Sequence, residues 1–256
     1  MKWMVKLSFF WLVMLVCFCS CSRMSQTDES GGSQGKKVKA VVVTAGHGFE
    51  RAPFFAIFDG FDNVDYTEAA QSDDSEIFED ISQWDYDVMV LYSMTQRISP
   101  KRRANFVRLL ERGVGLVALH HCIAAFQDWP EYQKIVGGKY YLKAAEQDGV
   151  KYPAGTYKHG RDMIVHVADS SHPVTKGISD FAINDETYKN CVFEKDNHIL
   201  LSTQEPTSDG PLCWARRYGK ARVCYIQLGH GRTAYSNEDY RLIIRRAIDW
   251  CAGKKQ

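Results

Sequence analysis

The side chains of this 256-residue chain that could do chemistry include five histidines and one glutamate, each near a stretch typical of a buried strand. Ligands of open parallel sheets collect beyond the carboxyl ends of the strands. Such sites draw their residues from loops that are distant in the sequence, as these six are. We therefore expect one site at one sheet edge, formed by His47, His120, His121, His159, Glu186 and His230.

Two kinds of chemistry suit this set. Neutral imidazoles and a carboxylate bind zinc or a similar divalent ion, and we assign His47 and His159 to that role, with His120 and His230 as further ligands. Alternatively, a histidine that titrates near neutrality acts as general acid or base beside an orienting carboxylate. The catalytic residues would then be His120, His230 and Glu186. No HxH or HxxxH spacing decides between the two.

Residues 113–122 contain the histidine pair. Glycines are followed by an apolar run that is typical of a strand buried on both faces, and the run ends in His120 and His121. Neighbouring side chains on a strand point to opposite faces, so we expect one of the two histidines to carry the chemistry and favour His120. A strand-end histidine of this kind is expected to be exposed.

Several aromatic residues lie near these motifs. Aromatic faces pack against the C–H surfaces of sugars, and tyrosine hydroxyls bond to sugar hydroxyls. Ordinary core packing is the alternative for each of them. The aromatics near the motifs are Trp129, Tyr140, Tyr141, Tyr157 and Tyr188, and our candidates for substrate binding are Trp129, Tyr141, Tyr188 and His121.

The elements that must position these residues alternate between strand and helix. Buried strands are predicted at 38–44, 86–92 and 116–120, and a capped helix is predicted to start at Ser99-Pro100 and end at Gly113. This order predicts an α/β domain with a mostly parallel sheet. Residues 139–160 have no clear period and are predicted to be an insertion or hairpin covering the site. Residues 213–228 form a predicted hairpin around Gly219, and Asn237 begins a last helix.

The start of the chain is typical of a targeting signal. The apolar run from Leu7 to Cys19 is shorter than the 20 or so residues that span a bilayer. It predicts a lipoprotein-type signal over residues 1–21 that ends at a lipobox with Cys21 as the lipidated residue. Phe18 departs from the usual leucine, and an ordinary signal peptide is the alternative. Residues 22–37 read as a flexible tether and 38–256 as the domain. We expect a bacterial cell-envelope protein on the periplasmic or outer surface, held to the membrane only by lipid.

Charge and cysteine usage exclude some classes of protein. The formal net charge is +1, which creates no strong field and argues against nucleic acid as a partner. Five cysteines follow Cys21, an odd number without CxxC spacing, so we expect free thiols rather than a disulfide framework. The oligomeric state stays open.

Four stretches together resemble the ThuA-like (trehalose-utilisation) family, and the resemblance covers nearly all of residues 38–252. It implies a flavodoxin-like, class I glutamine amidotransferase-like three-layer sandwich with a mostly parallel central sheet. It also implies carbohydrate utilisation, with a disaccharide, a glycoside or its 3-keto derivative as the small-molecule partner. The stretches are residues 115–121, 172–177, 185–188 and 219–230.

The chain departs from the amidotransferases of that fold. Those enzymes carry a cysteine nucleophile at a strand-to-helix elbow, where this sequence has Leu119-His120. Cys122 lies two residues further on without the flanking glycines of a strained elbow. Arg232 stands where their glutamate follows the late histidine. We therefore expect no glutamine amidotransferase activity. The alternatives to a sugar enzyme are a sugar-binding accessory protein and an amidase or peptidase using Cys122.

Overall fold

The computed structural model describes residues 36–72, 74–147 and 149–254. The predicted signal at 1–21, its Cys21 and most of the tether at 22–37 lie outside the described residues. Within the described ranges, no helix is both long enough and apolar enough to cross a membrane.

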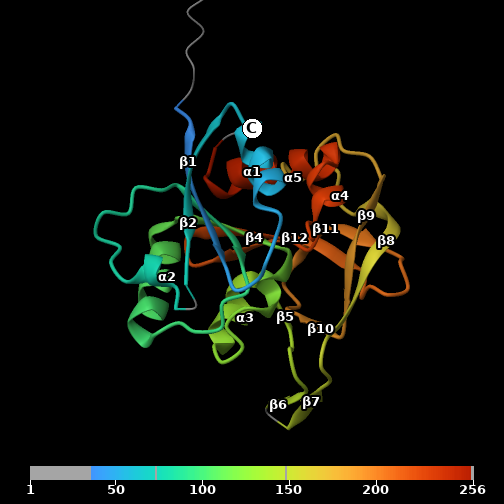
Figure 1. Ribbon diagram of the computed structural model, residues 1–256, viewed down its shortest axis with the longest axis horizontal. Helices are drawn as coiled ribbons and strands as arrows, with labels where there is room; N and C mark the ends of the chain where they lie inside the picture. The colour runs from blue at the N-terminus through green and yellow to red at the C-terminus, as the bar shows by residue number, and fades with distance from the viewer. Residues whose placement is uncertain (1–35, 73, 148, 255–256) are drawn as a thin grey trace, which may run out of the picture. The chain divides into compact units, whose positions relative to one another are not determined.

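A nine-stranded sheet forms the centre of the domain, in the order β2-β1-β3-β4-β13-β12-β11-β8-β9 (Figure 1). The strands from β2 to β13 pair in parallel, and those from β13 to β9 pair antiparallel. The parallel half has the flavodoxin order, whose switch point lies between β1 and β3. The strands are β1 Val38–Ala45, β2 Val64–Ala70, β3 Val88–Ser93, β4 Gly115–Leu119, β8 Thr156–Val167, β9 Phe181–Lys189, β11 His198–Thr203, β12 Pro211–Tyr218 and β13 Ala221–Ile226.

Helices cover both faces of this sheet. One apolar cluster joins α1 and α5 to the sheet, and a second joins α2 and α3 to the opposite face (Figure 1). These three layers confirm the predicted α/β sandwich, to which the antiparallel half adds four strands. The helices are α1 Arg51–Asp59, α2 Pro100–Arg112, α3 Pro130–Val136, α4 Arg232–Tyr235 and α5 Glu238–Cys251, with 3₁₀ turns η1 at Glu76–Phe78 and η2 at His120–Ala124.

Local sequence signals explain the helix ends. The Ser99 hydroxyl accepts a hydrogen bond from the Arg102 N–H at the start of α2, and Gly113 ends that helix with a φ of 99°. Asn237 caps α5 in the same way, by accepting from the Tyr240 N–H. Both caps lie where the sequence predicts them.

The segment 139–160 contains the predicted hairpin. It pairs β6, Ala145–Gln147, with β7, Val150–Tyr152, and this arm extends away from the large sheet (Figure 1). Before it, β5 at Gly138–Tyr140 pairs with β10 at Cys191–Phe193. The segment thus returns the chain to the start of β8 beside the candidate site.

Candidate functional site

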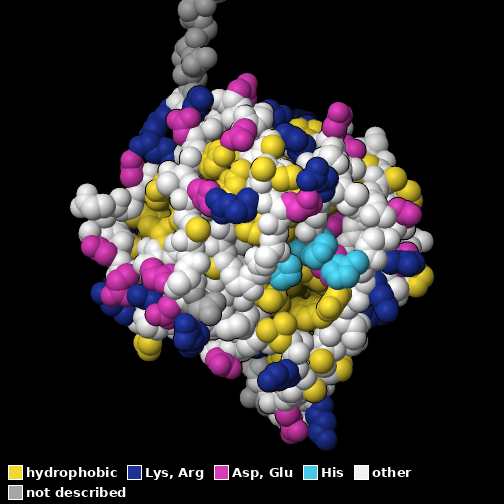
Figure 2. All heavy atoms as spheres, in the orientation of Figure 1, with side chains coloured by type: hydrophobic (Ala, Val, Ile, Leu, Met, Phe, Trp, Pro, Cys, Tyr) yellow, Lys and Arg dark blue, Asp and Glu magenta, His cyan; other side chains and the backbone are white. Residues whose placement is uncertain are grey.

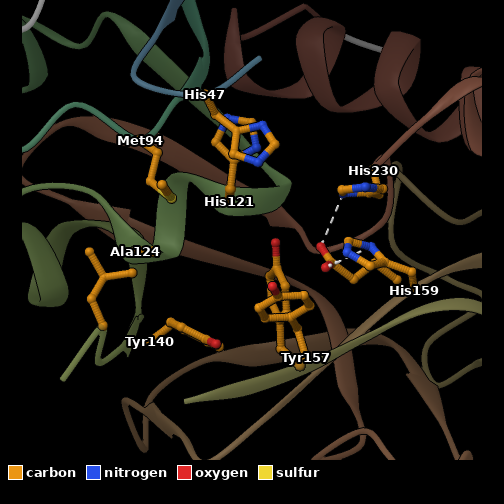
Figure 3. Close-up of a pocket in the computed structure, with 11 residues that line it drawn as sticks. His47, Met94, His121, Ala124, Tyr140, Tyr157, His159 and His230 are labelled. Atoms are coloured by element: carbon orange, nitrogen blue, oxygen red, sulfur yellow. Dashed lines mark ion pairs between the residues drawn. The ribbon is translucent and has the colours of Figure 1, made fainter. Parts of the chain in front are cut away.

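A cavity of about 260 Å³ lies beyond the carboxyl ends of the parallel strands (Figure 3). His47 follows β1, Met94 follows β3 and His230 follows β13, so three strand ends contribute to the wall. Glu186 on β9 and His159 on β8 enter from the antiparallel half. The cavity therefore lies between the carboxyl ends of the parallel strands and strands β8 and β9 of the antiparallel half, on the side that the parallel strands predict.

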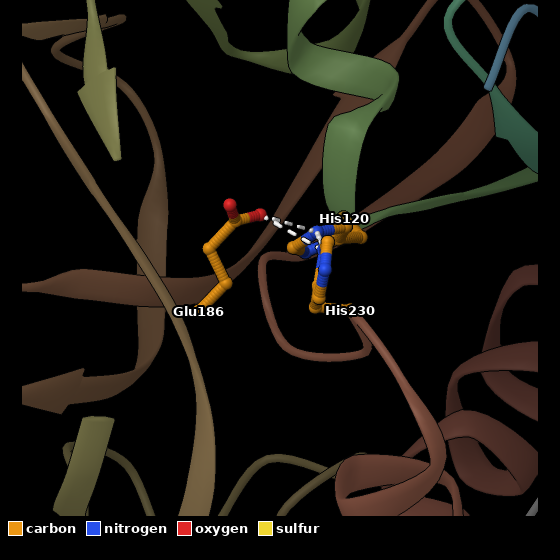
Figure 4. Close-up of side chains that lie close together, drawn as sticks. All are labelled: His120, Glu186 and His230. Carbon is orange, nitrogen blue, oxygen red and sulfur yellow. Dashed lines mark hydrogen bonds and ion pairs between the residues drawn. The ribbon is translucent and has the colours of Figure 1, made fainter. Parts of the chain in front are cut away.

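Three side chains beside the cavity converge on one point (Figure 4). The Glu186 Oε2 atom lies 2.9 Å from His120 Nε2 and 3.1 Å from His230 Nδ1. The two imidazole nitrogens are 3.2 Å apart. Glu186 and His120 are buried, whereas His230 is partly exposed to the cavity. We call these three residues the His120–Glu186–His230 centre.

Glu186 and His230 each have a shifted pKa in this centre. Burial alone would raise the pKa of Glu186, but hydrogen bonds and positive charge from His120 and His230 outweigh it and hold that pKa well below its usual value. The hydrogen bond and charge of Glu186 in turn raise the pKa of His230 above its ordinary value, against the opposing effect of burial. Glu186 is therefore an anion, and His230 retains its proton to higher pH than a free histidine.

His120 has an unusual backbone. Strand β4 ends at Leu119, and His120 opens η2 with a φ of 51° in the left-handed region. The prediction that the strand runs on to residue 120 was therefore wrong by one residue, and the expected alternation of the two histidines does not apply. The predicted exposure of His120 was also wrong, because its residue is only 1% exposed. The Tyr225 hydroxyl donates to the His120 carbonyl at 2.7 Å and supports this turn.

The ring of His120 has a defined orientation. Its Nδ1 lies 2.6 Å from the Gln227 carbonyl oxygen, which can only accept, so Nδ1 carries the hydrogen. In the neutral imidazole, Nε2 then directs a lone pair at Glu186 and at the Tyr188 hydroxyl, which lies 2.9 Å away. A contact between this nitrogen and a carboxylate is favourable when a proton or a cation lies between them.

Asp185 connects the strand of Glu186 to the loop of His230. Its Oδ2 accepts the Gly229 N–H at 2.6 Å, and its Oδ1 accepts the His230 N–H at 3.0 Å and the Glu186 N–H at 2.9 Å. Burial raises the pKa of Asp185, while the three N–H groups favour its ionised form. In the sequence, Asp185 lies in the stretch 185–188 but was not among the predicted site residues. Its position next to Glu186 is the one sequence signal that could have marked it.

His159 reaches the centre through a β-bulge. The pairing of β8 with β9 shifts register between Lys158 and Arg161, which leaves His159 in the irregular segment opposite Glu186. His159 Nδ1 lies 3.1 Å from Glu186 Oε1, on the side away from His120. The side chain is 57% exposed, so His159 lies at the rim of the cavity.

The remaining histidines of the predicted set form a stacked pair. His121 is buried, lines the cavity and stacks on His47, with ring centroids 4.7 Å apart (Figure 3). The atoms that could jointly hold an ion belong instead to His120, Glu186 and His230, all within 4.8 Å of one another. The predicted metal ligands His47 and His159 therefore lie beside the centre. Glu186, which was predicted to be catalytic, is its third member.

The donor set of this centre fits a divalent ion such as zinc. Two imidazole nitrogens and one carboxylate oxygen are ligands that zinc takes in catalytic sites. The Gln227 backbone carbonyl accepts the Nδ1–H of His120, so that Nε2 is the nitrogen directed at the centre, and such a bond is the usual support of a metal-binding histidine. The residues present therefore could hold an ion between them.

The predicted aromatic contacts divide into two groups. Tyr188 lines the cavity and contacts His120. Trp129 instead packs in the core against Phe106 and Tyr132, and Tyr141 stacks on Tyr152 beside a neighbouring groove. Tyr140 and Tyr157, which were noted as aromatics near the motifs, also line the cavity. So do Met94, Ala124 and Leu142, which no sequence motif indicated.

Cys122 has no access to this chemistry. It is fully buried, its thiol donates to the Leu91 carbonyl, and burial raises its pKa to about 12. A thiol in that state is a packing residue rather than a nucleophile. The five cysteines of the described ranges are free, as predicted, although the sulfurs of Cys213 and Cys224 lie 3.8 Å apart.

Comparison with known proteins accords with this fold. The ThuA family, described as trehalose utilisation, matches residues 39–251. The chain belongs to the ThuA family. This membership confirms the resemblance read from the four stretches, and the family description indicates a role in carbohydrate utilisation. No curated protein matches the chain significantly.

Solved structures share the fold of this ThuA-family chain at low identity. A ThuA-like protein from Parabacteroides merdae is 20% identical, has a TM-score of 0.74, and the match covers 85% of this chain and 91% of that one. A ThuA-like protein from Bacteroides uniformis is 20% identical with a TM-score of 0.60, over 84% and 91%. A beta-galactosidase from Bacillus circulans is 10% identical with a TM-score of 0.53, over 84% of this chain and 31% of that enzyme.

Proposed function

We propose that this ThuA-family protein is an enzyme of carbohydrate utilisation that acts on a disaccharide, a glycoside or its 3-keto derivative. The observation that carries the proposal is the convergence of His120, Glu186 and His230 on one point beside a cavity. Buried, mutually perturbed acid–base groups at a cavity are typical of catalytic sites.

The three residues have different parts in this proposal. His230 lies on the cavity wall and carries a raised pKa, so it is the proton carrier that meets the substrate. Glu186 orients His230 and balances its charge, with Oε1 left to His159 at the rim. His120 lies behind them, locked by Gln227, and holds Glu186 in position.

A 3-keto sugar gives this arrangement a suitable reaction. The keto group acidifies the C–H bond at C2, and an imidazole base takes that proton while the electron pair forms the enolate. The C1–O bond then breaks as the C1=C2 bond forms, and the departing glycosidic oxygen takes a proton from an imidazolium. Two neighbouring histidines, His230 and His159, face the cavity and can serve as base and acid.

A divalent ion, if bound, would be held by His120, Glu186 and His230. Its chemistry there would be to polarise a substrate oxygen and stabilise negative charge on it. Loaded in this way, His230 would be a ligand and His159 the proton carrier at the cavity wall, 3.1 Å from Glu186.

Turnover and metal content test the proposal together. The purified protein would be analysed for zinc and other divalent ions, then incubated with trehalose, other disaccharides, methyl glucosides and their 3-keto forms, with products followed by NMR. We expect release of a free sugar or aglycone from at least one of them, and its loss in Glu186→Gln. Tight binding of a sugar by both proteins without any product would instead favour the non-catalytic accessory role.

We also propose that the protein is anchored in the cell envelope through Cys21. The apolar run from Leu7 to Cys19 and the small residue before Cys21 support this proposal. Labelled fatty acid fed to the expressing bacterium should enter the wild-type protein and not the Cys21→Ser variant. Equal labelling of both proteins would sink the proposal.

A further inference from the structure

The cavity has two chemically different walls. One wall carries the imidazoles and Glu186, and the adjoining wall carries apolar and aromatic side chains, with the Tyr157 ring in contact with that of His159 (Figure 3). Figure 2 shows the same division on the surface, where histidines border a hollow whose other side is hydrophobic. The residues of the second wall, which we call the apolar wall, are Met94, Ala124, Tyr140, Leu142 and Tyr157, with Tyr188 at its junction with the centre.

Two members of the apolar wall are unusually exposed. Tyr157 is 54% exposed and Leu142 is 41% exposed, and they belong to a group of only four large hydrophobic residues that the described ranges expose. Single exposed hydrophobics need no explanation, but two that line the same cavity mark a ligand surface. Core packing does not account for either of them.

The apolar wall suits an apolar ring better than a second sugar ring. A sugar ring can lay its C–H face on an aromatic side chain, but the hydroxyl groups around its edge lose their bonds to water when apolar side chains cover them. Met94, Ala124 and Leu142 offer them no effective hydrogen-bond donor or acceptor. A flat apolar ring, in contrast, gains from stacking on Tyr157 and Tyr140 and from contact with Leu142.

From this division we infer that the substrate is a glycoside with a planar, apolar aglycone, such as an aryl glycoside. Its sugar faces the His120–Glu186–His230 centre and its aglycone lies against the apolar wall. The cavity volume of about 260 Å³ is that of a site for a small molecule. The inference rests on the proposed function for the placement of the sugar, and it names the substrate class for that same site.

Matched pairs of ligands test the inference. Binding of phenyl and methyl glucosides, both anomers of each and their 3-keto forms, would be measured by calorimetry with the full chain. We expect at least one phenyl compound to bind about ten-fold more tightly than its methyl counterpart, because it covers an additional apolar face. The double variant Tyr157→Ala/Leu142→Ala should lose this advantage and keep its affinity for the methyl compound.

Ile164 supplies the control. It lies on β8, as Tyr157 does, and is 51% exposed, but it does not line the cavity. Ile164→Ala should therefore retain the full preference for phenyl compounds. Loss of the preference in this variant, or its survival in the double variant, would overturn the assignment to the apolar wall.

The same measurements separate this inference from the proposed function. Equal binding of phenyl and methyl compounds, including no binding of either, overturns the inference, and turnover of methyl glycosides would still support the enzyme. A strong phenyl preference without turnover of any glycoside retains the inference and removes the proposed function.

Discussion

Within the described ranges, histidine and carboxylate meet in the centre and in two surface pairs, and only the centre borders the cavity. The His120–Glu186–His230 centre lies beside a cavity, whereas a surface group joins His198 to Asp169 at 2.9 Å, with His172 nearby. The residue types are the same in both. His198 is 54% exposed, while Glu186 is 6% exposed.

The two carboxylates are kept ionised by different neighbours. Hydrogen bonds from the Ser171 hydroxyl and N–H lower the pKa of Asp169 to about 2, and His198 adds little. Glu186 is buried and depends on its imidazole partners for its low pKa. The comparison teaches that burial makes the ionised state of Glu186 depend on its two histidine partners. A histidine and a carboxylate at the exposed surface do not depend on each other in this way.

The largest expected effect comes from removing the shared carboxylate. Glu186→Gln should lower turnover by about 10²–10⁴-fold, because His230 loses the group that orients it. It should also lower the metal content, measured by mass spectrometry of the purified protein. Asp169→Asn is the matched change in the surface group and should alter neither quantity. Similar losses in both variants would show that the centre and the surface group do not differ in function.

The next effect concerns the support of the centre by Asp185. Asp185→Asn replaces an oxygen that accepts the Gly229 or the His230 N–H, so the His230 loop should shift relative to Glu186. Changes in such supporting groups typically cost about 10–100-fold in metal affinity. Competition with a chelator would measure the zinc affinity, and cobalt substitution would report the ligand geometry by its absorption. An unchanged affinity and cobalt spectrum in a folded variant would show that Asp185 supports the fold alone.

A smaller effect is expected on stability. His120 is 1% exposed and hydrogen-bonded to Gln227, so His120→Ala should lower the free energy of unfolding by about 1–3 kcal/mol. The exposure predicted from the sequence would instead imply a loss of about 1 kcal/mol or less. His198→Ala should leave the denaturation midpoint unchanged. Urea titrations of both variants would measure this difference, and equal midpoints would contradict it.

The smallest effect is expected at Cys122, two residues from the centre. Its thiol has a pKa raised by burial to about 12, so iodoacetamide at pH 8 should leave it unmodified and turnover intact. Peptide mapping of the native and the denatured protein would identify the modified positions, and Cys122 should be labelled only after denaturation. Modification of Cys122 in the folded protein with loss of activity would revive the cysteine-dependent alternative.

Local signals were sufficient for much of the fold. The caps at Ser99 and Asn237, the buried runs of β1 and β3 and the turn at Gly219 are specified by neighbouring residues. They predicted the alternating elements and hence the parallel half of the sheet. The antiparallel half was less visible, because pairing between β8, β9 and β11 depends on contacts between residues far apart in the chain.

The candidate site divides in the same way. The sequence indicated that His120, Glu186 and His230 lie at strand ends or in a short strand, but it assigned His47 and His159 to the metal. Which imidazoles meet depends on sub-ångström details of the backbone, such as the left-handed turn at His120 and the β-bulge at His159. Trp129 and Tyr157 show the same limit, because an aromatic residue near a motif can face either the core or the cavity.

The sequence by itself determined the type of domain, its family resemblance and the supply of histidines and carboxylates at the strand ends. Only the tertiary structure decided that Glu186 is shared by His120 and His230, that Asp185 holds their two segments together and that Leu142 and Tyr157 line the same cavity. The physical reason is how far apart the interacting residues lie along the chain. Secondary structure follows from neighbours a few residues apart, whereas charge sharing and cavity shape follow from distances between residues up to 110 positions apart.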